Sequence, residues 1–95
     1  MAEWQLTFQI SAWDSEESRK VLKRLTKLDP LPIRAEYIPE REEVEVLFAV
    51  DVEGQFEAVR CQNEIDDKLQ TALKDIDVGI EFGNPAPAPK QKQGS

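Results

Sequence analysis

The stretch that most constrains the fold covers residues 43–53, EVEVLFAVDVE. Valine or phenylalanine stands at every second position from Val44 to Val52, which is the period of a β-strand with one buried face. The alternate positions hold Leu47 and Ala49 in the middle of the stretch, so the second face is partly apolar as well. The pattern predicts a central strand with neighbours on both sides inside a sheet.

Three further stretches have strand character. Residues 3–13 alternate apolar side chains with polar, mostly uncharged ones, which predicts a long first strand. Residues 33–38 lie between Pro32 and Pro39, and because proline lacks a backbone donor, we expect this strand at an edge of the sheet. Apolar residues alternate again over residues 76–82 and predict the last strand.

Two amphipathic helices separate these strands. The first begins after Asp14, which can accept hydrogen bonds from the free amides, with Glu17 placed as in a capping box. It must stop near Asp29 because Pro30 disfavours helical geometry before it. The second helix is expected over residues 55–74. The buried stripes are Val21, Leu22, Leu25 and Leu28 in the first helix, and Ala58, Cys61, Ile65, Leu69, Ala72 and Leu73 in the second.

The order of elements is therefore β-α-β-β-α-β. It predicts an α+β, ferredoxin-like βαββαβ sandwich, in which a four-stranded antiparallel sheet of order 4-1-3-2 carries both helices on one face. Residues 1–83 make up the predicted domain. Residues 84–95 alternate proline with alanine before a polar end, which predicts a disordered tail or a linker.

Charge and residue usage exclude several classes of function. The formal net charge of −7 disfavours binding to nucleic-acid phosphate, and no apolar run approaches membrane-spanning length. The lone Cys61 forms no internal disulfide, which favours a cytoplasmic location. The chain has no histidine, the commonest general base and a common metal ligand. We expect no enzyme activity, no cofactor and no metal site.

The functional variants of this fold fit poorly. An RNA-recognition domain has stacking aromatics on its two central strands, where this chain has Thr7, Gln9, Leu47 and Ala49. The first strand–helix loop, WDSE at residues 13–16, has neither the paired cysteines of a soft-metal carrier nor the glycine-containing anion cradle of an acylphosphatase. The absence of glycine there also weighs, less strongly, against a small-molecule-sensing domain of ACT type.

Two groups of side chains remain as candidate sites. Trp13 and Phe56 each follow the end of a strand, and we expect them to be neighbours at one end of the sheet, either as an interface or as a cover for the core. The protein-binding candidates on the open sheet face and beside it are Thr7, Gln9, Trp13, Ile38, Leu47, Ala49, Phe56 and Val59. A basic face on the first helix comprises Arg19, Lys20, Lys23, Arg24 and Lys27.

These observations favour a non-enzymatic interaction or adaptor domain that binds a protein partner, including a second copy of itself, through the open sheet face or the edge strand at residues 33–38. The alternative is an ACT-like, dimeric domain that senses a small molecule. A third hypothesis, an acidic mimic of nucleic acid, has only the net charge of −7 behind it.

Overall fold

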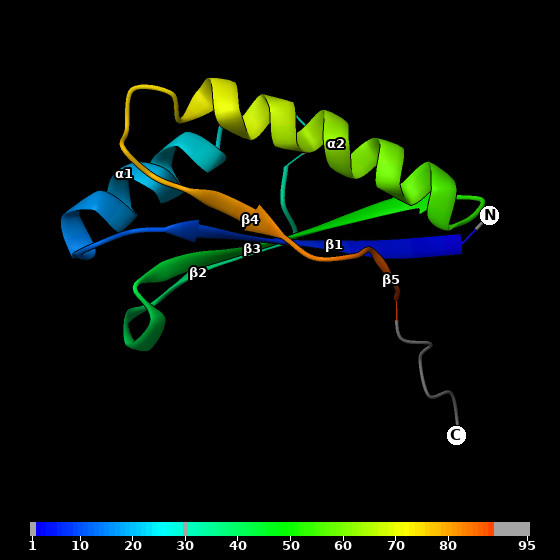
Figure 1. Ribbon diagram of the computed structural model, residues 1–95, viewed down its shortest axis with the longest axis horizontal. Helices are drawn as coiled ribbons and strands as arrows, with labels where there is room; N and C mark the ends of the chain where they lie inside the picture. The colour runs from blue at the N-terminus through cyan, green and yellow to red at the C-terminus, as the bar shows by residue number, and fades with distance from the viewer. Residues whose placement is uncertain (1, 30, 89–95) are drawn as a thin grey trace.

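The computed structural model describes residues 2–29 and 31–88, and it shows an α+β fold in which an antiparallel sheet carries two helices (Figure 1). The elements in chain order are β1 (Ala2–Ser11), α1 (Ser15–Leu25), β2 (Arg34–Ile38), the short 3-10 helix η1 (Pro39–Arg41), β3 (Glu43–Val52), α2 (Gln55–Ala72), β4 (Ile80–Phe82) and β5 (Ala86–Pro87).

The sheet follows the path β2-β3-β1-β4, and β5 pairs with β1 off this path. For these four strands the path is the predicted order 4-1-3-2 read from the opposite edge. The structure adds a fifth strand, β5, which was not predicted. Strands β1 and β3 form the centre and pair along their whole length, with Leu6 opposite Phe48 and Phe8 opposite Val46.

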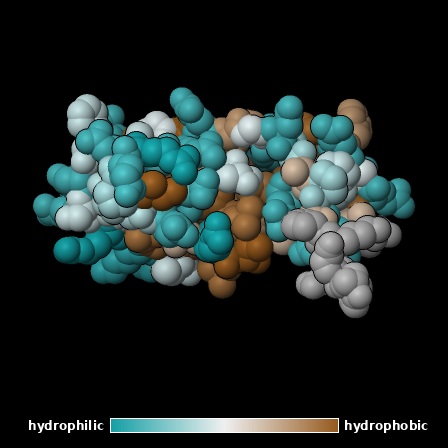
Figure 2. Space-filling view, turned by 90° about the horizontal axis from the view of Figure 1, so that it is seen from below, coloured by the Kyte–Doolittle hydropathy of each residue, from teal (hydrophilic) through white to brown (hydrophobic). Residues whose placement is uncertain are grey.

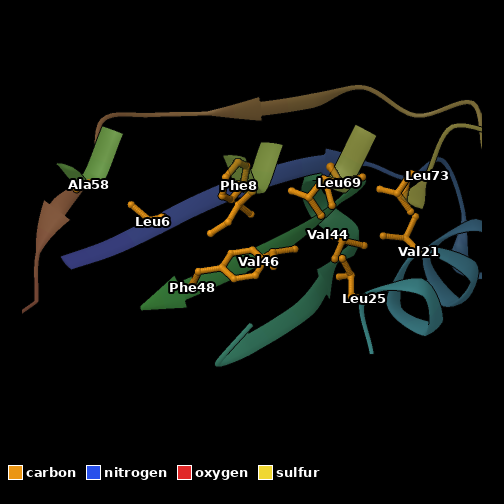
Figure 3. Close-up of a cluster of buried hydrophobic side chains, with 13 residues drawn as sticks. Leu6, Phe8, Val21, Leu25, Val44, Val46, Phe48, Ala58, Leu69 and Leu73 are labelled. Carbon is orange, nitrogen blue, oxygen red and sulfur yellow. The ribbon is translucent and has the colours of Figure 1, made fainter. Parts of the chain in front are cut away.

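The core lies between this sheet and the helices (Figure 3). Leu6, Phe8 and Ile10 of β1 are completely buried, as the alternation predicted. The rings of Phe8 and Phe48 meet edge to face, with centroids 5.6 Å apart. The helices add buried side chains from both predicted stripes, namely Val21 and Leu25 from α1 and Ala58, Ile65 and Leu69 from α2, followed by Leu73.

The start of α1 uses the predicted capping residues. The Asp14 carboxylate accepts a hydrogen bond of 2.8 Å from the backbone amide of Glu17, and the Glu17 carboxylate accepts one of 2.8 Å from the amide of Trp13. The helix ends at Leu25, before the predicted Asp29. The amide of Leu28 donates to the carbonyl of Leu25 at 3.2 Å, so the chain continues as tighter turns beyond the helix.

The last predicted strand is shorter than expected. Strand β4 covers only Ile80–Phe82, because the preceding residues form turns in which the amide of Val78 donates to the carbonyl of Ile76 at 2.9 Å. Phe8 pairs with Phe82, whereas Trp4 pairs with Pro87, so the strand opposite β1 gains one residue between these pairs. An extra residue on one strand is a β-bulge, and this one lies between β4 and β5.

Residues 84–88, which the sequence assigned to the tail, lie along β1. Pro85 is buried, and the amide of Ala88 donates to the carbonyl of Glu3 at 2.9 Å. Gln62 of α2 is also buried, and its side-chain amide donates to the carbonyl of Gly83 at 2.6 Å. This hydrogen bond links α2 to the segment between β4 and β5 that contains the bulge. The rest of the predicted tail, residues 89–95, falls outside the described residues.

Candidate protein-interaction surface

One face of the sheet turns away from the helices and brings together the candidates from the three strands β1, β2 and β3. Because side chains alternate along a strand, the neighbours of buried Leu6 and Phe8 point to this open face. Thr7 lies opposite Leu47. The other paired positions on this face are Gln5 with Ala49, Gln9 with Glu45, Arg34 with Leu47, and Ile38 with Glu43.

The middle of the open face is low in charge. Thr7, Gln9, Ile38, Leu47 and Ala49 are all half-buried, so they are packed among neighbours but still reach the surface. Figure 2 views the molecule from below, where the sheet lies, and shows hydrophobic side chains gathered near the middle and hydrophilic ones around them. The five sheet candidates therefore share one surface.

The outer edge of β2 is the second part of this surface. Within the residues that the structure describes, β2 pairs with β3 alone. Leu31 and Ile33, just before the strand, are 60% and 59% exposed. A hollow of about 430 Å³ lies between α1 and this edge, and its lining is mostly apolar. The lining residues are Leu22, Leu25, Thr26, Leu31, Pro32, Ile33, Arg34 and Ala35.

Sequence reasoning missed Leu31 and Ile33 as surface residues. The signal was present, because the segment Leu31-Pro32-Ile33 is apolar and precedes a strand that proline places at an edge. The period of a strand gives only the face on which Ile33 lies, and the exposure of that side chain depends on how α1 packs against β2.

Trp13 and Phe56 lie at opposite ends of the sheet, and the expectation that they are neighbours is wrong. Strands β1 and β3 are antiparallel, with Ser11 opposite Glu43 and Ala2 opposite Val52. A residue after the end of β1 is therefore remote from one after the end of β3, as Figure 1 shows for the starts of α1 and α2.

Neither aromatic side chain covers the core. Trp13 is 73% exposed and Phe56 is 80% exposed, and Val59 is also exposed on α2. Phe56 and Val59 lie off the buried stripe of α2, as their positions in the sequence predicted. Phe56 and Val59 lie on α2, on the helix side of the sheet, and so do not belong to the surface formed by the open face and β2.

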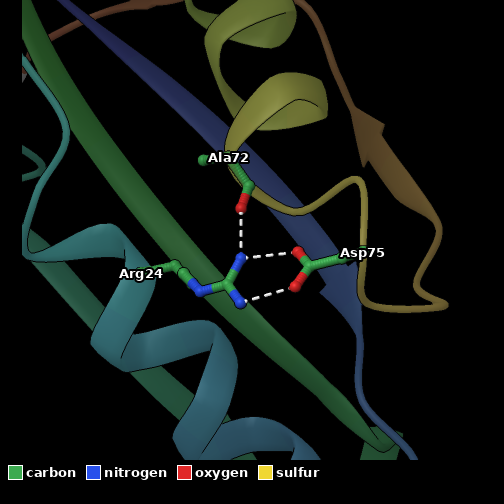
Figure 4. Close-up of polar contacts among 3 residues, drawn as sticks. All are labelled: Arg24, Ala72 and Asp75. Atoms are coloured by element: carbon green, nitrogen blue, oxygen red, sulfur yellow. Dashed lines mark hydrogen bonds and ion pairs between the residues drawn. The ribbon is translucent and has the colours of Figure 1, made fainter.

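Arg24 is part of a contact between the two helical regions, so the predicted basic face loses one member (Figure 4). Its guanidinium donates to both oxygens of the Asp75 carboxylate, at 2.7 and 2.8 Å, and to the carbonyl of Ala72 at 2.7 Å. Ala72 is the last residue of α2, so Arg24 caps a carbonyl that the helix leaves without a partner.

The same contact changes the titration of Asp75. The hydrogen bonds from Arg24 favour the ionised carboxylate and lower the pKa of Asp75 to about 2. The remaining members of the basic face, Arg19, Lys20, Lys23 and Lys27, are all exposed.

Carboxylates and the single thiol, that of Cys61, are the other groups in the chain that could bind a metal ion or react. Within residues 2–29 and 31–88, no three or more carboxylate, thiol or imidazole groups are placed to hold a metal ion. Cys61 is half-buried, and its burial, followed by the charges of Glu64 and Glu57, raises the pKa of the thiol. The thiol is therefore held in its protonated, weakly nucleophilic form.

No helix in the described part of the chain combines the length and the apolar character needed to cross a membrane. The chain matches no family model, and neither the curated proteins nor the solved structures include one with significant similarity to it.

Proposed function

We propose that this chain is a non-enzymatic protein-interaction or adaptor domain, which binds its partner along the outer edge of β2 and the adjoining open sheet face. The observation that carries the proposal is the apolar hollow beside that edge, together with the exposed Leu31 and Ile33. A strand edge presents backbone donors and acceptors that an extended segment can pair with. Apolar side chains beside the edge add specificity and buried area.

The open sheet face supports the same proposal. Leu47 and Thr7, in the middle of the face, are half-buried and uncharged although the protein is strongly acidic. Charged residues are depleted at the centres of protein interfaces, because removing a charge from water without a partner is costly. A partner strand added to β2 would extend the sheet and continue this surface.

We infer a ferredoxin-like sandwich whose β4 edge is continued by β5, which also pairs with β1; the order β2-β3-β1-β4 supports it. A cytoplasmic location is supported by the single cysteine.

A matched pair of variants tests the surface. Ile33→Asp places a charge beside β2, and Phe56→Asp makes the same kind of change on α2, which packs against β1 and β3. Both side chains are mostly exposed, so we expect both variants to stay folded. Proteins captured by the unaltered chain would be identified, purified and titrated against each variant by calorimetry.

The proposal predicts a partner that binds the unaltered chain and Phe56→Asp equally, and binds Ile33→Asp at least about tenfold more weakly. Equal affinity of every captured partner for Ile33→Asp would contradict it. Loss of binding in Phe56→Asp alone would show that the partner binds α2 and would contradict the proposed surface.

A further inference from the structure

We propose that the occupant of the β2 edge is a second copy of this chain, paired antiparallel through its own β2 about a two-fold axis at Ala35. The inference rests on the proposed function, since it uses the same edge and names the partner. A two-fold interface requires a surface that is complementary to itself. The charge pattern of β2 meets that requirement.

Arg34 and Glu36 carry the complementarity. Both project from the open face, opposite Leu47 and Glu45 of β3, and both side chains are mostly exposed. Their charged groups are 3.6 Å apart within one chain. In an antiparallel pair centred on Ala35, Arg34 lies opposite the partner subunit's Glu36, and the partner subunit's Arg34 lies opposite Glu36. Opposite charges directly across a strand pair are favourable.

The neighbouring registers are unfavourable. Centring the pair on Arg34 places the two arginines opposite each other, and centring it on Glu36 places the two glutamates opposite each other. Like charges directly opposite destabilise a strand pair. The sequence of β2 therefore selects the register centred on Ala35.

The other face of the strand fits this register. Ile33 comes to lie opposite the partner subunit's Tyr37, on the side of the sheet that faces α1. Ile33 is 59% exposed in the single chain and borders the hollow beside Leu22 and Leu31, so the pairing would cover apolar surface. Pro32 and Pro39 bound the strand and limit the pairing to a short segment. We therefore expect a dimer whose population depends on concentration.

Sedimentation velocity on the full chain tests the proposal. The unaltered protein should pass from 10.8 kDa toward twice that mass as its concentration rises to about 1 mM. Arg34→Glu and Glu36→Arg should each weaken the dimer about tenfold, because each places like charges in both pairs. Arg60→Glu and Glu64→Arg, matched charge changes at exposed positions of α2, should leave it unchanged.

An equimolar mixture of the two β2 variants is the decisive measurement. One variant carries two acids at the paired positions and the other carries two bases, so a mixed dimer has opposite charges in both pairs. Association should return in the mixture, which also shows that both variants are folded. Failure of the mixture to associate while the unaltered chain dimerises would overturn the Ala35 register.

An unaltered chain that stays monomeric up to about 1 mM would overturn the dimer itself. The two proposals fail separately. If the chain stays monomeric and a different protein still loses affinity for Ile33→Asp, the interaction surface stands and only the second copy is wrong. If neither association nor partner binding responds to changes at β2, both proposals are wrong.

Discussion

Gln62 offers the sharpest test of how the C-terminal segment is held on the sheet. Its side chain is 2% exposed on α2, and its amide donates to the carbonyl of Gly83, which lies between β4 and β5. Gln62→Leu keeps the volume of the side chain roughly constant and removes this donor. We expect the penalty to be the net value of one hydrogen bond, about 1 kcal/mol.

We expect that loss to act locally. The segment at residues 86–88 is held by few contacts, so its opening free energy falls by about 1 kcal/mol, whereas the added leucine offsets the loss in global stability. Native-state hydrogen exchange followed by NMR measures this directly. The amide of Ala88, bonded to the carbonyl of Glu3, should exchange about fivefold faster.

Two controls define the result. The amide of Ser11, bonded to the carbonyl of Gly79, should keep its exchange rate, because it lies beyond the other end of β4. Gln70→Leu removes an exposed glutamine from the same helix and should change neither rate. Unchanged exchange at Ala88 in Gln62→Leu would refute the role of Gln62 as the anchor. Equal acceleration at Ala88 and Ser11 would show that the effect is global.

Three further outcomes follow from the structure. Phe8→Ala should lower the free energy of unfolding by about 3–5 kcal/mol in urea titrations, because a fully buried ring leaves a cavity; a loss below about 1 kcal/mol would contradict its central place. Asp14→Ala should cost about 1 kcal/mol in the same assay, since the amide of Glu17 loses its acceptor. The pKa of Asp75 is lowered to about 2, so its pair with Arg24 stabilises the fold above the ordinary carboxyl pKa, and the stabilisation is lost as pH falls toward about 2. The stability difference between the unaltered protein and Asp75→Asn should therefore be present at pH 7 and vanish near pH 2, and a difference that does not depend on pH would count against the pair.

Local patterns in the sequence predicted much of the fold. Alternation identified the buried face of β1 and β3, and helical spacing identified Val21, Leu25 and Leu69 as core residues, because these periods follow directly from backbone geometry. Asp14 was identified as a cap for the same reason, since its partner is only three residues away. The same alternation predicted that Thr7 and Leu47 lie on the open face of the sheet, where the structure pairs them.

The tertiary structure decided what depends on distant partners. The bond between Arg24 and Asp75 joins residues 51 positions apart. The residues next to Arg24 and Asp75 in the sequence do not predict this contact. Gln62 is a polar residue in the buried stripe of α2. Its burial is explained by the hydrogen bond to the carbonyl of Gly83, which is 21 positions away.

The sequence by itself determined which side chains share a face of each strand and helix, because that depends only on the repeat of the backbone. The tertiary structure alone decided that Trp13 and Phe56 lie at opposite ends of the sheet, since this follows from the antiparallel pairing of β1 with β3. It also decided that Leu31 and Ile33 border an apolar hollow, because packing brings Leu22 and Leu25 of α1 to the same hollow. The sequence predicted the open-face residues Thr7 and Leu47, whereas the exposure of Leu31 and Ile33 beside the edge of β2 required the packed fold.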